Sequence, residues 1–267
     1  MKTEITRIFL VCISLMITGL ILTGQSSAKL DLGTVAGLWL FDEGKGTTAK
    51  DSSGNGNDGT LQGTKWVKGQ VGSALSFNGT SDRIIVPDSD SLDLQKAWTI
   101  TSWIYVNKSE NGYGHIAGKR NDGLNVANYA FRTNNTGVSW ESYFKFGGAW
   151  KGAWGQGVVK KDTWLYMTAT YDGTNTITIY ENGVKIGSAT VGSPPPADQA
   201  EVHIGGWQNN ASELIDGMLD EVAIFGVAIT EDDMKNLMTK GIEKAIGITP
   251  VEPSSKLSAT WADIKAR

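Results

Sequence analysis

Cysteine is nearly absent from this 267-residue chain, and its single copy, Cys12, lies in an N-terminal apolar run. Removing that run as a leader would leave no cysteine, so the chain must hold itself by its core and by any hard metal ion that it binds. The two histidines, His115 and His203, are too far apart in sequence for a zinc motif. Charged residues make up only 19% and the net charge is −4, which argues against a nucleic-acid partner.

The N-terminus has the pattern of a secretory signal peptide. Lys2 and Arg7 precede an apolar run at residues 8–22, and small residues Ser26 and Ala28 follow at signal-peptidase spacing. The run is short for a bilayer span, which needs about 20 residues, although a retained anchor is the alternative. We predict cleavage after residue 28, no membrane span after removal of the leader, and a protein that is secreted or held at the cell surface.

Thirty-three glycines and many short apolar segments indicate strands joined by turns. Strand patterns occupy residues 35–41, 99–106, 164–171, 202–206 and 218–225. In residues 99–106 both faces are partly apolar, as in a strand covered on both sides. Residues 176–181 and 184–191 flank Asn182-Gly183, a pair that tolerates the positive φ angles of a type I′ turn. This segment predicts a β-hairpin.

One helix is predicted near the C-terminus. Thr230 is a candidate N-cap with Asp233 three residues later, Met234 and Leu237 begin an apolar stripe, and Gly241 ends it. Beyond it, residues 248–255 indicate an extended linker. The predicted organisation is a signal peptide at 1–28, one domain at 29–240, and a linker and tail at 241–267.

Several motifs resemble, in order, those of the laminin-G-like, concanavalin A-like jelly-roll domains. The motifs are GLWLFDEG at 37–44, DSSGNGN at 51–57, ALSFNGTSD at 74–82, Trp103, ATYDG at 169–173, the Asn182-Gly183 hairpin, IGG at 204–206, and Asp216-Gly217 with LDEV at 219–222. The resemblance covers about residues 32–240. It implies an all-β, two-sheet antiparallel sandwich of about a dozen strands, one sheet convex and one concave, with one short C-terminal helix. This fold hosts lectins, enzyme modules and adhesion domains, so it leaves the function open.

No catalytic constellation is recognisable in the sequence. Glycoside hydrolases of this fold carry two carboxylates in a Glu-x-Asp-x-x-Glu run, and the chain has no such run. The nearest acidic segment, from Glu213 to Glu221, has different spacing, and structural or metal-linked roles suit its acids better. We therefore predict that the chain is not an enzyme, and keep an unrecognised glycosidase as a lesser alternative.

A structural calcium ion is the predicted cofactor. In related proteins such an ion joins the first strand, a nearby loop and the last strand. By position, Asp42 and Asp220 match that arrangement, and the Gly79 carbonyl is a candidate main-chain ligand. The alternative is that Asp42 and Asp220 cap turns or pair with lysine and arginine.

Ten tryptophans are many for this length, and most of them belong to strand segments where core packing is the natural interpretation. Trp150, Trp154 and Trp207 differ because glycines or amide residues such as Asn209 lie nearby. Aromatic faces stack on sugar rings and amides bind hydroxyls, so these four residues are the candidate ligand-binding site. The alternative is that the rings fold back over the sandwich edge.

The sequence thus predicts a secreted, non-catalytic module that binds carbohydrate, its partner being a polysaccharide or a glycoprotein glycan. A structural or adhesion protein that binds surface or matrix proteins is the second hypothesis. Competition by soluble sugar separates the two.

Overall fold

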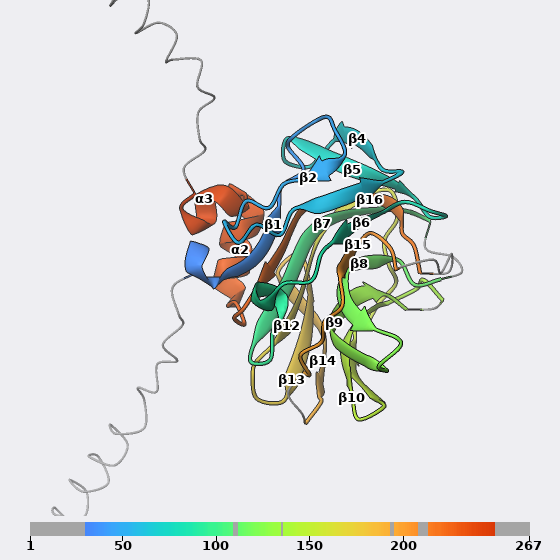
Figure 1. Ribbon diagram of the computed structural model, residues 1–267, viewed down its shortest axis with the longest axis vertical. Coiled ribbons are helices and arrows are strands. Elements are labelled where there is room, and N and C mark those ends of the chain that lie inside the picture. Colours follow the sequence, from blue (N-terminus) through green and yellow to red (C-terminus); the bar gives the residue numbers. More distant parts are fainter. Residues whose placement is uncertain (1–29, 109–111, 135, 193–194, 208–212, 249–267) are drawn as a thin grey trace, which may run out of the picture.

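The computed structural model describes residues 30–108, 112–134, 136–192, 195–207 and 213–248. Within these residues, sixteen strands form two eight-stranded antiparallel sheets packed as a sandwich (Figure 1). The predicted all-β jelly-roll architecture is confirmed, with more strands than the expected dozen. The helical elements are short: η1 (Leu32–Thr34), η2 (Asp90–Leu92), α2 (Glu231–Lys240) and α3 (Ile242–Ile246).

The first sheet, called here the helix-side sheet, contains the long central strands. Its strand order is β14 (Val184–Thr190), β13 (Thr176–Glu181), β12 (Trp164–Tyr171), β7 (Trp98–Lys108), β16 (Asp216–Phe225), β5 (Ser73–Asn78) and β4 (Lys65–Lys68), with β1 (Val35–Trp39) also paired to β16. The β13–β14 hairpin turns at Asn182 and Gly183, whose φ angles are 50° and 74°. The predicted turn is confirmed.

The second sheet, called here the pocket-side sheet, runs antiparallel throughout. Its strand order is β11 (Ala149–Trp154), β10 (Trp140–Phe146), β9 (Val126–Thr133), β8 (His115–Asn121), β15 (Val202–Ile204), β6 (Arg83–Val86), β3 (Gly59–Gln62) and β2 (Thr48–Ala49). Strands β8 to β11 lie side by side, so they can present one continuous outer surface.

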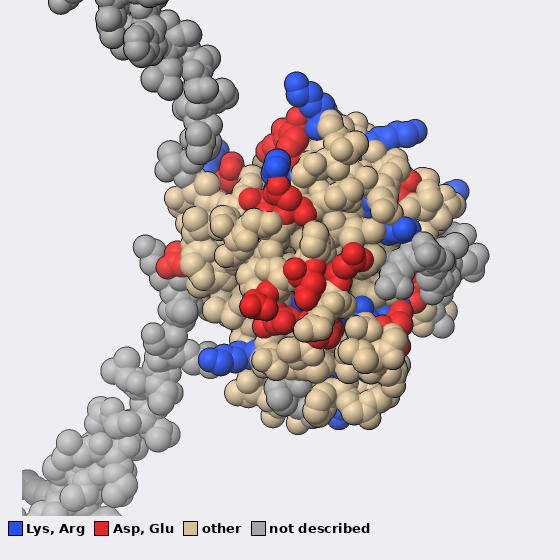
Figure 2. Space-filling view, viewed as in Figure 1, with Lys and Arg blue, Asp and Glu red and all other residues tan. Residues whose placement is uncertain are grey.

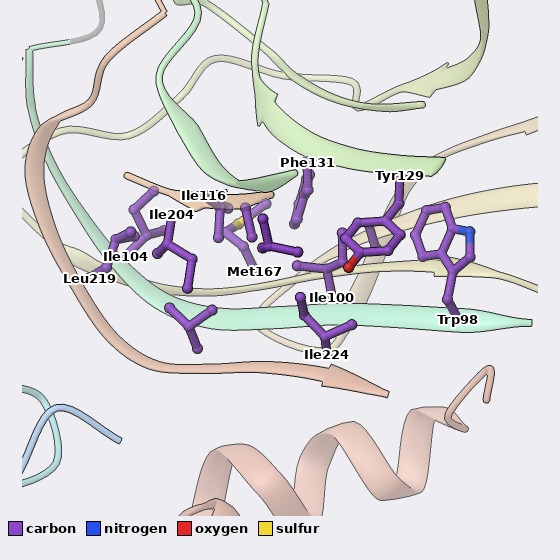
Figure 3. Close-up of a cluster of buried hydrophobic side chains, with 14 of the residues drawn as sticks. Trp98, Ile100, Ile104, Ile116, Tyr129, Phe131, Met167, Ile204, Leu219 and Ile224 are labelled. Carbon is purple, nitrogen blue, oxygen red and sulfur yellow. The ribbon is translucent and has the colours of Figure 1, made fainter. Parts of the chain in front are cut away.

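The main core fills the space between the sheets. Ile100 and Ile104 of β7 meet Ile116 of β8 and Phe131 of β9, and all four are fully buried (Figure 3). The period-2 alternation of a strand sends these side chains to one face of each sheet. Burying such side chains contributes about 1.5–3 kcal/mol each before entropic costs.

The outer face of the helix-side sheet is covered by α2 and α3 (Figure 1). Trp103 points to this side of β7 and packs in a cluster with Leu237, which is fully buried. This explains why β7 is apolar on both faces. The N-cap Thr230 and Asp233 form the predicted capping box.

The packed chain extends beyond the predicted domain boundary at residue 240. Gly241 ends α2, as predicted, but the chain immediately forms α3, whose Ile242 and Ile246 are buried in the helix cluster. No helix in the described part of the chain has the length and apolarity needed to cross a bilayer.

Candidate functional site

The outer face of the pocket-side sheet carries three rows of side chains paired in register across β8, β9, β10 and β11. The charged row consists of His115, Arg132, Glu141 and Trp154. The small row consists of Gly118, Ala130, Tyr143 and Gly152. The rim row consists of Arg120, Ala127, Lys145 and Trp150.

The small row creates a hollow between the other two rows. Gly118, Ala130 and Gly152 carry little or no side chain, so only the Tyr143 ring rises from this row. Neighbouring rows are two residues apart on β10 and β11, about 7 Å along a strand, while one step on β8 and one on β9 are three residues because the register shifts there. The resulting pocket has a volume of about 380 Å³, and its lining includes Arg120, Arg132, Glu141, Tyr143 and Glu213. It is large enough for one or two sugar rings.

A buried ion network fixes the base of the pocket. Glu213, in the segment that leads into β16, lies 2.9 Å from Arg120 Nη1, 3.1 Å from Arg132 Nη1 and 3.0 Å from His115 Nε2, in each case through Oε2. Arg132 also bonds Glu141 Oε1 at 2.7 Å, directly across the strand pair. Opposite charges facing each other in this way stabilise a sheet register.

Burial and charge set the protonation states of this network. Burial alone would raise the pKa of Glu213, but hydrogen bonds and charge from His115 and Arg120 lower it to about 2. Burial lowers the pKa of His115 to about 4, and the charge of Arg132 acts in the same direction. Burial raises the pKa of Tyr143 to about 12. Near pH 7 the pocket therefore contains an ionised glutamate, a neutral imidazole and a protonated phenol.

Trp150 and Trp154 stand on either side of Gly152 on the edge strand β11, and both line the pocket. Their side chains are 51% and 55% exposed, although side chains of this size are usually buried. The Trp150 ring meets Tyr143 edge to face with centroids 4.9 Å apart, and Trp154 Nε1 donates to Glu141 Oε2 at 3.2 Å. The structure thus brings together the two tryptophans that the sequence predicted, each held in a defined orientation.

Trp207 was expected beside them, but it is only 1% exposed. Its ring lies beneath the Arg120 guanidinium at 4.3 Å, and its Nε1 donates to Asp122 Oδ2 at 3.1 Å. Because it faces protein on all sides, Trp207 has no free ring face for a sugar, and it supports the pocket from behind. Asn209 lies outside the described residues.

The predicted calcium residues Asp42 and Asp220 meet at the turn that precedes β5. Asp42 Oδ1 accepts from Ser73 N and Asp220 Oδ2 from Val71 N, both at 2.8 Å. A Cβ placed on Gly69 would lie 2.5 Å from Asp220 Oδ2 and 2.6 Å from the Ser73 carbonyl oxygen, so both oxygens border one small space.

This acidic site has features that suit a hard cation. Asp220 Oδ1 and Glu221 Oε2 are buried and have no hydrogen-bond partner among the residues that the structure describes. Burial, together with the charges of Glu221 and Asp42, raises the pKa of Asp220 to about 8. Among the described residues, however, no group of three or more His, Cys, Asp or Glu side chains is arranged to hold a metal. An ion here would need main-chain and water oxygens besides the two aspartates.

Gly79 does not belong to this acidic site. It follows the far end of β5, where a Cβ on it would lie 2.8 Å from the Cβ of Asp216. Six residues of extended chain, about 20 Å, separate it from Ser73. The prediction failed because β5 runs antiparallel to β16, which places its beginning, rather than its end, beside Asp220.

Sequence reasoning missed the charged residues of the pocket. Arg132 and Glu141 lie on either side of the connection between β9 and β10. A hairpin centred on the turn-rich residues 134–137 would have placed Arg132 opposite Ser139, so the sequence did not reveal the observed pair. Arg120 and Glu213 are 93 residues apart, and only the three-dimensional fold brings them together.

Three solved structures illustrate the fold shared with known proteins. Domain 4 of AbnA, an extracellular arabinanase from Geobacillus stearothermophilus, was solved with arabinotriose; it is 18% identical with a TM-score of 0.60, over 76% of this chain and 98% of that domain. The binding domain of Paraclostridial Mosquitocidal Protein 1 is 17% identical with a TM-score of 0.64, over 78% and 52% of the two chains. The binding domain of botulinum neurotoxin DC was solved with rat synaptotagmin II. It is 13% identical with a TM-score of 0.62, and the match covers 78% of this chain and 52% of that one.

This chain spans about half the length of the two toxin domains. At these identities the likeness shows the fold alone. A search of curated protein sequences found no match.

The family follows from the sequence itself. Residues 78–235, more than half of the chain, match the family described as the Concanavalin A-like lectin/glucanases superfamily. The matched region runs from the end of β5 into α2 and includes every strand that forms the pocket. The observed two-sheet sandwich agrees with this match, and the chain therefore belongs to the concanavalin A-like lectin/glucanase superfamily.

Proposed function

We propose that this protein is an exported, non-catalytic module that binds a glycan in the pocket on β8 to β11. The observation that carries the proposal is the pair of half-exposed tryptophans, Trp150 and Trp154, beside a hollow lined by oriented polar groups. Indole faces stack on the apolar faces of sugar rings, while fixed donors and acceptors bind hydroxyls. Domains that share this fold were solved with arabinotriose or with rat synaptotagmin II, which supports a binding role.

The state of the pocket carboxylate supports binding rather than hydrolysis. A glycosidase needs a carboxylic acid that is still protonated near neutral pH, so its pKa must be raised. Glu213 has the opposite shift, to about 2, because His115 and Arg120 stabilise its charge. Glu141 is held by Arg132 and by Trp154, so it too serves as a hydrogen-bond acceptor. A glycosidase would have to take its proton-donating acid from a carboxyl group other than Glu213.

Export is part of the proposal. It is supported by the signal-peptide pattern of residues 1–28, which lie outside the described residues. Cell fractionation with an antibody to the chain tests it. Retention of the uncleaved protein in the cytoplasm would contradict it.

The glycan-binding function is tested on an array and by pull-down with insoluble polysaccharides. Trp150→Ala and Trp154→Ala should each weaken binding to any ligand that is found. Val184→Ala, which truncates a 66% exposed side chain on the β13–β14 hairpin, is the matched control and should bind like wild type. Equal binding by wild type, the two tryptophan variants and the Val184→Ala control would exclude the pocket as the binding site.

Protein binding is the second candidate function. Leu124 and Phe146, which are 68% and 49% exposed, lie in or beside the two turns near Trp150, outside the pocket lining. Exposed apolar side chains of this kind suit contact with a protein. If a soluble sugar does not compete with a captured partner, the partner is recognised as protein.

A structural calcium ion completes the proposal, with Asp42 and Asp220 as its carboxylate ligands and the Ser73 carbonyl oxygen beside them. Its support is the orphaned oxygen of Asp220 and the absence of a lysine or arginine ion pair to either aspartate among the described residues. The ion would neutralise two charges where β16, β1 and the turn before β5 meet. Calcium should raise the Tm of the EDTA-treated protein, and equal Tm values would contradict the site.

A further inference from the structure

We infer that the pocket selects neutral sugar chains and rejects acidic ones such as uronates, sialylated glycans and sulfated glycans. This inference rests on the proposed function and narrows its ligand class. Two buried arginines in a pocket would ordinarily suggest an anionic ligand. The contacts of these two arginines lead to the opposite conclusion.

The donors of Arg120 face protein groups. Its Nε is buried and lies 2.8 Å from Asp122 Oδ1 without hydrogen-bond geometry, and its Nη2 bonds Asp122 Oδ2 at 3.1 Å and Glu213 Oε1 at 3.3 Å. Its Nη1 bonds Glu213 Oε2 at 2.9 Å and the Tyr143 hydroxyl at 3.3 Å. The four N–H groups of Nη1 and Nη2 thus have four protein acceptors, and burial keeps Nε away from a ligand. Trp207 also covers one face of the group.

Arg132 keeps a single nitrogen, Nη2, that can donate to a ligand. Its Nε bonds Glu141 and its Nη1 bonds Glu213, while the ring centroids of Tyr113 and Tyr143 lie 3.6 and 4.6 Å from its Cζ. Only Nη2 makes no hydrogen bond or ion pair with the described residues. A carboxylate or phosphate is bound best through two parallel N–H groups of one guanidinium. One nitrogen suits a hydroxyl or a ring oxygen instead.

The charge of the pocket also disfavours an anion. Its lining contains two arginines and three carboxylates, those of Asp122, Glu141 and Glu213, which gives a net charge of −1. Lys145, at the rim, brings the sum to zero; its Nζ bonds Asn125 and lies 4.2 Å from the Trp150 ring centroid. The pocket with its rim therefore has no net positive charge to attract an anion. The Asp122 side chain is 53% exposed, so it can accept a sugar hydroxyl and repels a sugar carboxylate.

Surface charge beyond the pocket also disfavours the attraction of an acidic glycan. On the face shown in Figure 2, acidic side chains gather in a band across the middle, while lysine and arginine lie mostly toward the edges. The whole chain has a net charge of −4. Long-range attraction would therefore not steer an acidic glycan toward this molecule.

Matched sugar pairs test the selection. The probes are lactose with sialyllactose, xylo-oligosaccharides with their glucuronate-substituted forms, and galacto-oligosaccharides with oligogalacturonates, each titrated by calorimetry at low and at physiological salt. Wild type should bind the neutral member of at least one pair at least about tenfold more tightly than its acidic partner. Asp122→Asn should narrow that ratio. Asp232→Asn, which changes an exposed acid on α2, should leave it unchanged.

The outcomes separate this inference from the function on which it rests. Binding of an acidic member as tightly as its neutral partner, or an unchanged ratio in Asp122→Asn, would overturn the selection and leave glycan binding in place. Failure of wild type to bind any probe or any array glycan would overturn both.

Discussion

Glu213→Gln is the substitution that best tests whether the pocket is held by its ion network. The change keeps the size and shape of the side chain but removes its charge. Arg120 and Arg132 then lose a shared partner that contacts them at 2.9 and 3.1 Å. Each keeps one carboxylate, Asp122 or Glu141 respectively, so neither becomes wholly unpaired.

The expected loss of stability follows from these contacts. Removing one partner of a buried ion pair costs about 3–5 kcal/mol when the other charge is left uncompensated. Because both arginines keep a second partner here, we expect the lower end, about 3 kcal/mol. In a domain of this size 1 kcal/mol shifts Tm by about 2–4 °C, so Tm should fall by about 6–12 °C.

The pH dependence gives a second signature. The pKa of Glu213 is about 2 in the folded chain, against an ordinary value of 4.5 for the unfolded chain. The contribution of Glu213 to the free energy of unfolding is therefore present above pH 4.5 and is lost as the pH falls toward 2. The gap in free energy of unfolding between wild type and Glu213→Gln should therefore be constant near pH 7 and close between pH 4.5 and 2.

Chemical unfolding monitored by circular dichroism, at several pH values, measures both signatures. Glu201→Gln is the matched control, since that side chain is 54% exposed and lies 3.5 Å from His203. It should change Tm by less than 2 °C. A Tm for Glu213→Gln within 2 °C of wild type, or a gap that does not depend on pH, would refute the network as a stabilising element.

Three further changes test other parts of the structure. Leu237→Ala removes a fully buried α2 side chain and should cost about 2–5 kcal/mol in thermal unfolding, whereas the surface change Lys235→Ala should cost little. Thr230→Ala removes the N-cap of α2 and should cost about 1 kcal/mol in the same assay, and an unchanged Tm would contradict the capping box. Asp220→Asn should abolish any rise of Tm with calcium and leave the Tm in EDTA near pH 7 almost unchanged, because burial raises the pKa of Asp220 to about 8 and keeps the metal-free carboxyl mostly neutral; a variant that still responds to calcium would exclude Asp220 as a ligand.

The fold could be predicted from the sequence because its signals are local. Asn182-Gly183 sets a hairpin through the φ angles of two neighbouring residues, and Thr230 with Asp233 sets a helix start within one turn. The boundary at residue 240 was less predictable, since a glycine that ends one helix can also begin another. Only the burial of Ile242 and Ile246 shows that the packed chain continues.

The candidate site was only partly predictable because it depends on distant pairings. Trp150 and Trp154 could be predicted from their residue type and from the glycines beside them in the sequence. Trp207 has similar neighbours, but the pairing of its backbone N–H with the carbonyl of Glu213 turns it inward. The prediction of Gly79 as a main-chain calcium ligand failed for the same reason. The direction of β5 beside β16 is a property of the sheet rather than of either segment.

The location of the ligand is tested most directly by nuclear magnetic resonance of the indole N–H groups during titration with a glycan that binds. Trp150→Ala and Trp154→Ala assign two of the signals, and buried Trp98, in the core, provides an internal reference. Both pocket signals should shift and saturate at the Kd found by calorimetry, while the Trp98 signal stays in place. Saturable binding with neither pocket signal moving would place the ligand elsewhere on the molecule.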